Sequence, residues 1–303
     1  MKTDIISTEH IIMIIVAIST GTCARILTVK EDFRQYPSYP NGYLTNLVTG
    51  FVAAALGAVA IPALMTKNFI AVTFLTLAIQ QFREVRKAER ESLKDLEDAE
   101  YTSRGNAYID GIAKTFEARN YFALIVSFGS ALTMQLINSK IMAINIVSGI
   151  ITGFILLFVL KRFSKGKTIG DIAEVESGII SLKNNDLYVN GIYVTNLLGS
   201  DDASSLFQKE GIAAVISPNE ERFRITLDHF GQQQAALFEA TRTLGLKRYH
   251  YTRKDFENGK VIITFVPILK DADRLIEAIK KTPLLESTKK NKDVLSTNFV
   301  GRN

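Results

Sequence analysis

Long apolar runs fill the first half of this chain and limit what it can fold into. They occupy residues 11–27, 43–65, 120–137 and 141–160. Each is about long enough to cross the hydrocarbon of a bilayer as a helix. A fifth run, 69–82, would reach only about 21 Å as a helix, so it is predicted to be shielded by neighbouring helices or to be re-entrant.

The distribution of Lys and Arg favours five crossings over four. Five crossings place Lys2, Lys67 and Lys140 on one side of the membrane. The other side then holds Arg25, Lys30 and Arg34, eight basic residues between Arg83 and Arg119, and the basic run from Lys161 onward. Cytoplasmic loops carry the excess of positive charge, so we expect the N-terminus outside and the C-terminal half in the cytoplasm.

The predicted fold class is a membrane α-helical bundle of about five transmembrane helices, residues 1–165, followed by a cytosolic α+β domain. Residues 82–101 contain neither Gly nor Pro and have opposite charges at helical spacing, as in Lys87 with Glu91. They are predicted to continue the third helix into a cytoplasmic helical arm over 83–118.

Short apolar runs with turn residues replace the long ones after residue 170. Residues 170–200 are predicted to form a small β module, with turns at "KNND" and "NG". Residues 205–283 are predicted to form a ββαββα module, in which "AAVIS" and "RFRITL" are its first two strands. The Lys-rich end of the chain, 284–303, is predicted to be a flexible tail.

Several classes of chemistry find no support in the sequence. A single cysteine, Cys23, cannot form an intramolecular disulfide, which fits a reducing compartment. No phosphate loop, dinucleotide fingerprint or zinc spacing occurs, and the three histidines are far apart, so no metal and no cofactor are expected. The formal charge of +5 comes with basic residues beside the membrane segments, which predicts contact with lipid head groups and no nucleic acid.

The stretch "YIDGIAKTFEARNY" (108–121) resembles the signature of the YIEGIA family, membrane proteins of endospore-forming Gram-positive bacteria. Asp110 stands where the family name has Glu. Three further stretches resemble the same family: "DFRQYPSYPNGYL", "AVTFLTLAIQQFREVR" and "TIGDIAEV".

The resemblance implies a location in the spore or forespore membrane and a part in sporulation. It also implies regulated membrane proteolysis of the aspartic type, acting on a cytosolic protein such as a translation initiation factor, with a small regulatory protein as a further partner. The alternative is a non-catalytic scaffold. In that case the carboxylates hold the bundle together and the α+β module recruits cytosolic partners.

An aspartic protease needs two carboxylates close enough to share a proton and activate one water. Asp32, Asp110 and Asp171 all fall near helix ends on the predicted cytoplasmic side, so they are the candidates for a catalytic dyad. If relatives carry Glu at position 110, the dyad is Asp32 with Asp171, and Asp110 and Glu117 orient Arg25, Arg34 or Arg119. Each carboxylate is otherwise a helix-end ion pair or cap.

A stiff loop follows the first apolar run in "RQYPSYPNG", where prolines fix the backbone and tyrosines can anchor at the membrane interface. The loop is predicted to be such an anchor or a lip over a substrate groove. The candidate binding residues are Arg34, Tyr36, Tyr39, Glu117 and Arg119.

Overall fold

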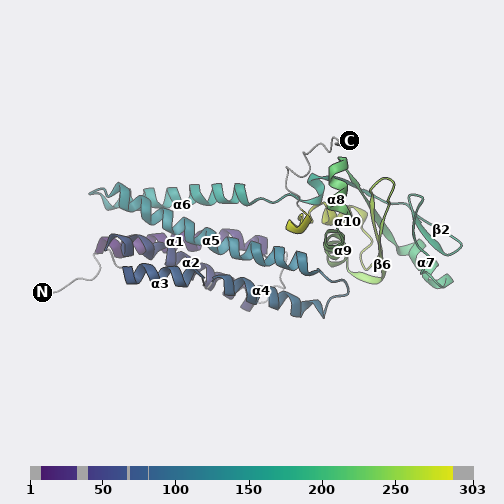
Figure 1. Ribbon diagram of the computed structural model, residues 1–303, viewed down its shortest axis with the longest axis horizontal. Coiled ribbons are helices and arrows are strands. Elements are labelled where there is room, and N and C mark those ends of the chain that lie inside the picture. The colour runs from purple at the N-terminus through teal and green to yellow at the C-terminus, as the bar shows by residue number, and fades with distance from the viewer. Residues whose placement is uncertain (1–7, 33–39, 67–68, 81, 289–303) are drawn as a thin grey trace, which may run out of the picture. The chain divides into compact units, whose positions relative to one another are not determined.

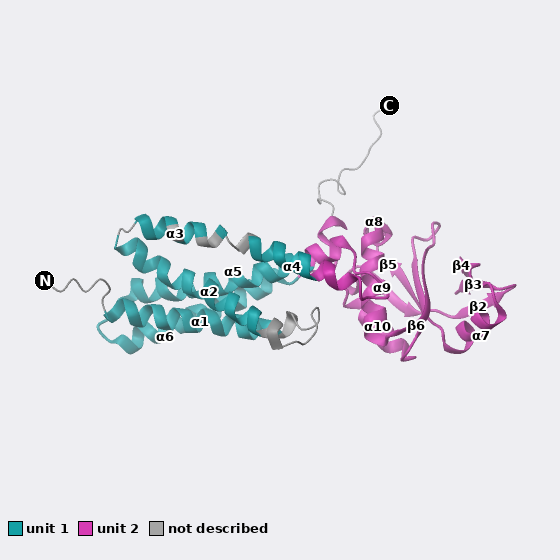
Figure 2. Cartoon of the chain, turned by 90° about the horizontal axis from the view of Figure 1, so that it is seen from below, with its two compact units in different colours: residues 1–92, 112–165 teal, residues 93–111, 166–303 magenta. Residues whose placement is uncertain are grey.

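The computed structural model describes residues 8–32, 40–66, 69–80 and 82–288 (Figure 1). The chain divides into two compact units, shown in different colours in Figure 2. The first unit comprises Met1–Ser92 and Ile112–Lys165, and the second comprises Leu93–Gly111 and Gly166–Asn303.

Helices make up the first unit, and four of them are long and apolar enough to cross a membrane. The helices of this part of the chain are α1 (Thr8–Asp32), α2 (Pro40–Met65), α3 (Phe69–Gln80), α4 (Phe82–Glu97), α5 (Asn106–Ile137) and α6 (Met142–Ser164). The four are α1, α2, α5 and α6. Helix α3 has 12 residues and is about 18 Å long, well short of the hydrocarbon thickness, so the count of five is not confirmed.

Small residues bring the helices of the first unit into close contact. A methyl group on Gly57 of α2 would lie 2.3 Å from the Leu124 carbonyl oxygen of α5. One on Gly149 of α6 would lie 2.6 Å from Met134 Cγ. Apolar helices associate in this way when burial from water no longer drives them together.

A fully buried arginine lies near the end of α1. The guanidinium of Arg25 donates to Asn46 Oδ1 at 3.4 Å and to Thr28 Oγ1 at 3.5 Å, and it lies 5.2 Å from the ring centroid of Phe116. Gly50 makes room for this side chain, because a Cβ there would lie 2.3 Å from Arg25 Cγ. The bundle therefore packs around a charge that hydrogen bonds and an aromatic ring stabilise.

The range 83–118, predicted to be a helical arm, forms two helices with a break between them. Helix α4 ends at Glu97, and α5 begins at Asn106 after Gly105, whose φ of +83° favours glycine. Thr102 and Arg104 of the connection are buried, as is Leu93 of α4. Helix α5 then runs without a break from the motif to Ile137.

A four-stranded antiparallel sheet forms the centre of the second unit, in the order β1-β5-β7-β6. Its strands are β1 (Ala173–Ser177), β5 (Ile212–Pro218), β6 (Leu246–Lys254) and β7 (Val261–Pro267). Helices α9 (Phe230–Leu244) and α10 (Ala272–Lys280) pack on one face, where residues such as Phe265 and Leu275 are fully buried.

A smaller antiparallel sheet covers the other face, in the order β2-β3-β4. It consists of β2 (Ile180–Lys183), β3 (Asp186–Val189) and β4 (Ile192–Thr195). Helix α7 (Asp201–Glu210) completes this layer and buries Phe207 against Val215 and Ile262. The central sheet thus has a hydrophobic core on both faces.

Two sequence predictions for this unit are corrected. Strand β1 pairs with β5 of the central sheet, so residues 170–200 are not a separate module. The segment "RFRITL" is not a strand: it forms the 3-10 turn η2 (Glu221–Phe223) and the short helix α8 (Arg224–Asp228). Phe223 and Leu227 both face the core, which is the i, i+4 spacing of a helix, whereas Ile225 between them is exposed. The pattern ββαββα holds only if β1 supplies the first strand.

The predicted flexible tail begins too early. Residues 284–288 pack against the unit and end in the 3-10 turn η3 (Glu286–Thr288). The buried side chain of Gln232 donates to the Pro283 carbonyl at 3.0 Å and accepts from the Leu285 amide at 2.9 Å. The rest of the predicted tail, 289–303, lies outside the described residues.

We predict that Gly50→Ala lowers the unfolding temperature of the detergent-solubilised protein, because the new methyl group overlaps Arg25 Cγ and Cβ. Overpacking of this kind costs about 1–3 kcal/mol. Gly111→Ala is the matched control: it also lies in a helix, its Cβ would meet nothing within 4 Å, and it should be neutral or stabilising. Equal melting of the two variants would contradict the close contact at Gly50.

Candidate functional site around the Tyr108–Gly111 motif

The motif lies in the first turns of α5. One carboxylate accepts hydrogen bonds from the backbone of the segment just before it. Glu97, at the end of α4, accepts hydrogen bonds from the backbone amides of Arg104 at 2.7 Å and Gly105 at 3.3 Å. The Gly105 carbonyl then accepts from the amides of Tyr108 and Ile109 as α5 begins. Glu97 thus fixes where the helix of the motif starts.

Tyr108 joins the start of α5 to α9. Its hydroxyl donates to Glu239 Oε1 at 2.6 Å, and Glu239 also pairs with Arg242 at 3.3 Å. The ring of Tyr108 is 3% exposed and packs edge-on against Phe238. The first residue of the motif is therefore a structural contact inside the second unit.

Arg104 strengthens the same junction. It is 4% exposed, pairs with Glu100 at 3.0 Å, and lies 4.6 Å from the ring centroid of Phe238. Thr102 and Thr241 share a hydrogen bond of 2.6 Å beside it. Sequence reasoning missed this junction. The only signal was the spacing of Glu100 and Arg104, and nothing in the sequence pointed to α9 as their partner.

Asp110 is half-buried in the second unit, next to the buried residues Ile109 and Ile112. At its neighbour Gly111 an added Cβ would meet nothing within 4 Å, so the helix surface beside the carboxylate is open. Partial burial is one of the conditions that separate the two protonation states of an aspartic dyad. The catalytic assignment of Asp110 stays a prediction.

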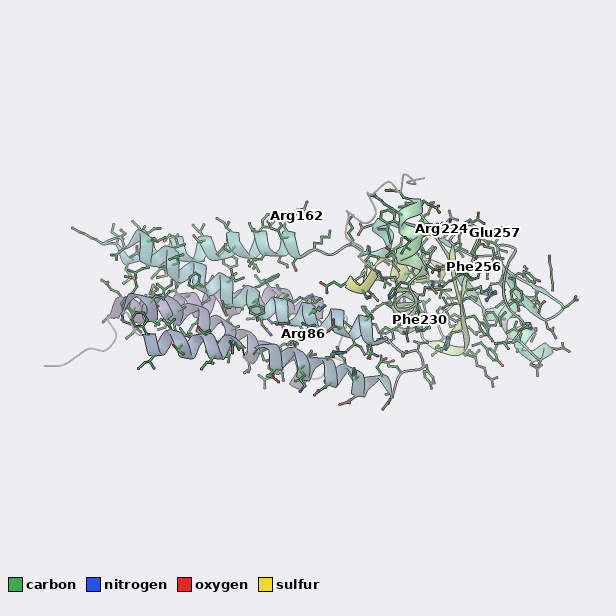
Figure 3. All side chains as sticks on the ribbon, viewed as in Figure 1. Arg86, Arg162, Arg224, Phe230, Phe256 and Glu257 are labelled. Atoms are coloured by element: carbon green, nitrogen blue, oxygen red, sulfur yellow. The ribbon has the colours of Figure 1, made fainter. Side chains whose placement is uncertain are left out.

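Glu117 has a partner from another helix. Arg86 of α4, labelled in Figure 3, lies with Nη1 3.7 Å from Glu117 Oε2, and the Glu117 side chain is 16% exposed. Arg119 is 9% exposed, and its neighbour Asn120 is 1% exposed. Neither amide atom of Asn120 has a hydrogen-bond partner among the residues that the structure describes.

Asp171 has a local structural role. It is exposed at the end of the 3-10 turn η1 (Ile169–Asp171), where its carboxylate accepts from the Thr168 amide at 2.7 Å and from the Thr168 hydroxyl at 3.1 Å. The bond from the Thr168 amide is one half of a capping box, and the Thr168 side chain completes it by accepting from the Asp171 backbone amide. An exposed carboxylate engaged in a cap lacks the desolvation that a proton-sharing dyad requires.

The remaining candidates cannot be placed. Asp32 is the last residue of α1, and its side chain lies outside the described residues. Arg34, Tyr36 and Tyr39 lie outside them altogether. Over 8–32, 40–66, 69–80 and 82–288, no three His, Cys, Asp or Glu side chains gather as a metal site would require.

Comparison with known proteins gives one family and one relative. A family model described as YIEGIA protein matches residues 13–294. The uncharacterized protein YphB of Bacillus subtilis (strain 168) is 32% identical over 286 residues, which cover 92% of this chain and 94% of that protein. No solved structure matches the chain.

We predict that Tyr108→Phe loosens the junction between α5 and α9. It removes the donor to a largely buried carboxylate, which costs about 1–2 kcal/mol. Hydrogen exchange over residues 98–107 should become faster in the variant. Tyr101→Phe is the control, because Tyr101 is 85% exposed in the same connection and should not change exchange. Unchanged protection in Tyr108→Phe would show that its hydroxyl does not hold the junction.

Proposed function

The chain belongs to the YIEGIA family, and from that membership we propose that it anchors a cytosolic α+β module to the membrane of an endospore-forming bacterium and recruits a soluble protein there. The relative in Bacillus subtilis, a spore former, supports this cellular setting. The proposal places the protein in the spore or forespore membrane.

The docking of Tyr108 onto α9 carries the proposal. Residues 93–111 belong to the second unit, and α5 continues from them as one helix into an apolar stretch that ends at Ile137. Tyr108, Arg104 and Thr102 thus belong to the packing of the module, and the helix that begins there continues into the apolar stretch. In this proposal the module presents its surface to soluble partners beside the membrane.

The charge distribution supports a cytoplasmic location of this module. Helix α6 ends with Lys161 and Arg162 in its last turn, and Lys165 and Lys167 follow. Basic residues that flank the end of an apolar helix favour the cytoplasmic side. The N-terminus would then lie outside, if α3 and the start of α4 together complete a fifth crossing.

Proteolysis of the recruited protein is a second candidate function, favoured by the half-buried position of Asp110 beside the open surface at Gly111. In this chemistry an ionised acid takes a proton from water, whose oxygen adds to the peptide carbonyl carbon while a protonated acid donates its proton to the carbonyl oxygen. The C–N bond then breaks as a proton passes from the first acid to the leaving nitrogen, which leaves a carboxyl group and an amine. Asp32 is the better second acid, because Asp171 is exposed and caps a turn. Scaffold and protease share the recruitment step and differ in the fate of the partner.

We predict that the full chain in detergent retains a specific set of soluble proteins from the cytosol of sporulating cells. If recruitment alone is the function, Asp110→Asn and Asp32→Asn retain the same proteins in the same amounts. If proteolysis follows, both variants retain more of one intact protein than the wild type does, as inactive enzymes that trap their substrate. Quantitative mass spectrometry of the retained proteins distinguishes these outcomes.

Asp273→Asn is the control, because Asp273 is an exposed acid of α10 far along the chain from the motif. It should behave as the wild type in both cases. Retention of no soluble protein above empty micelles would refute recruitment. If Asp171→Asn retained more of one intact protein than the wild type, and neither Asp32→Asn nor Asp110→Asn did, Asp171 would be a catalytic acid.

A further inference from the structure

A row of alternating cations and tyrosines crosses the second unit from β2 to β6. The Lys183 ammonium lies 5.5 Å from the ring centroid of Tyr188. The rings of Tyr188 and Tyr193 are 5.7 Å apart and meet edge to face at 71°. The Arg253 guanidinium lies 5.6 Å from the centroid of Tyr193. We name these four residues the cation–tyrosine row.

Strand register places the two tyrosines of the row on the face of the small sheet that points away from its core. Tyr188 pairs with Tyr193 across β3 and β4. Their neighbours Leu187, Val189 and Val194 are buried in the core between the two sheets. Since side chains alternate between the two faces of a strand, the tyrosines face outward, and both are half-buried.

The row joins an edge of each sheet. Strand β4 is an edge of the three-stranded sheet, and β6 is an edge of the four-stranded sheet. Neighbouring strands lie about 4.8 Å apart, so Lys183 and Arg253 flank at least about 10 Å of surface. An extended peptide that crosses the strands covers this distance with three or four residues, at about 3.3 Å per residue.

Both cations of the row are exposed, and neither forms an ion pair within the described part of the chain. Arginine and lysine side chains elsewhere in the same unit have partners within the fold. Arg224 pairs with Glu221 at 2.6 Å and donates to the carbonyls of Phe256 and Glu257 (Figure 3). In the row, contact with the rings orders the cations while their N–H groups stay available to an outside acceptor.

We propose that the cation–tyrosine row binds an acidic, extended segment of the soluble protein that the module recruits; this inference rests on the recruitment function proposed above. Carboxylates match the two cations in charge and spacing. A single-stranded nucleic acid fits less well, because bases bind by stacking on open aromatic faces. Here each ring already has a cation over one face, and the two rings meet edge to face.

The test measures binding of labelled peptides to the full chain in detergent micelles at low salt by fluorescence anisotropy. The probes are a short peptide with two Glu about four residues apart, the same peptide with Lys in place of Glu, and a uridine oligonucleotide. The wild type should prefer the Glu peptide. Lys183→Glu combined with Arg253→Glu should weaken it about tenfold and prefer the Lys peptide.

Two further double variants make the result specific. Lys183→Gln with Arg253→Gln removes the charge without reversing it, so it should lose the preference without gaining the opposite one. Arg222→Glu with Lys281→Glu makes the same change in net charge elsewhere in the unit, and Arg222 also lies over a ring, that of Phe223. This control should keep the wild-type preference. Thermal unfolding of each variant checks that it is folded.

Three outcomes overturn the proposal: equal binding of both peptides by the wild type, tighter binding of the uridine oligonucleotide, or an unchanged preference in folded Lys183→Glu/Arg253→Glu. The retention experiment with cytosolic proteins distinguishes failure of this proposal from failure of the recruitment function. If the charge-reversed variant retains the same cytosolic proteins as the wild type, recruitment stands and uses another surface. If the peptide preference reverses but the wild type retains no protein, the row binds acidic segments and the recruitment function is wrong.

Discussion

The hydrogen bond from Tyr108 to Glu239 is the contact on which the arrangement of the second unit depends. It is formed by the first residue of the motif and a residue 131 positions later, so it closes a very long loop. Arg104 on Phe238 and the pair of threonines add to it, and Glu97 fixes the backbone that leads into it. The segment before and at the start of α5 is therefore packed into the second unit, although it is far from α9 in the sequence.

The packing of the helices in the first unit has a different physical basis. In a bilayer, apolar side chains would gain little from contact with each other, so close backbone approach would have to hold the bundle together. Gly57 and Gly149 permit that approach. Gly50 instead accommodates Arg25, whose burial would be costly without Asn46, Thr28 and the ring of Phe116. Glycines of α2 and α6 thus serve both close packing and the accommodation of a buried charge.

Cation–aromatic contacts recur through the second unit with two different consequences. Arg104 is buried on Phe238 and paired with acids, so its charge is neutralised inside the fold. Lys183 and Arg253 rest on tyrosines at the surface and have no carboxylate partner among the described residues. The first arrangement stabilises the junction of α5 with α9, and the second leaves two exposed cations against tyrosine rings.

The sequence by itself determined the two-part architecture, the four long apolar helices and the family, because these follow from local composition, periodicity and motif. Tertiary structure alone decided the rest. "RFRITL" alternates like a strand, yet Phe223 and Leu227 meet the core at helical spacing. Strand β1 looked like part of a small module but pairs with β5. Asp171 caps a turn, and Tyr108 holds α9, because the partners of these residues come from segments that no local pattern identifies.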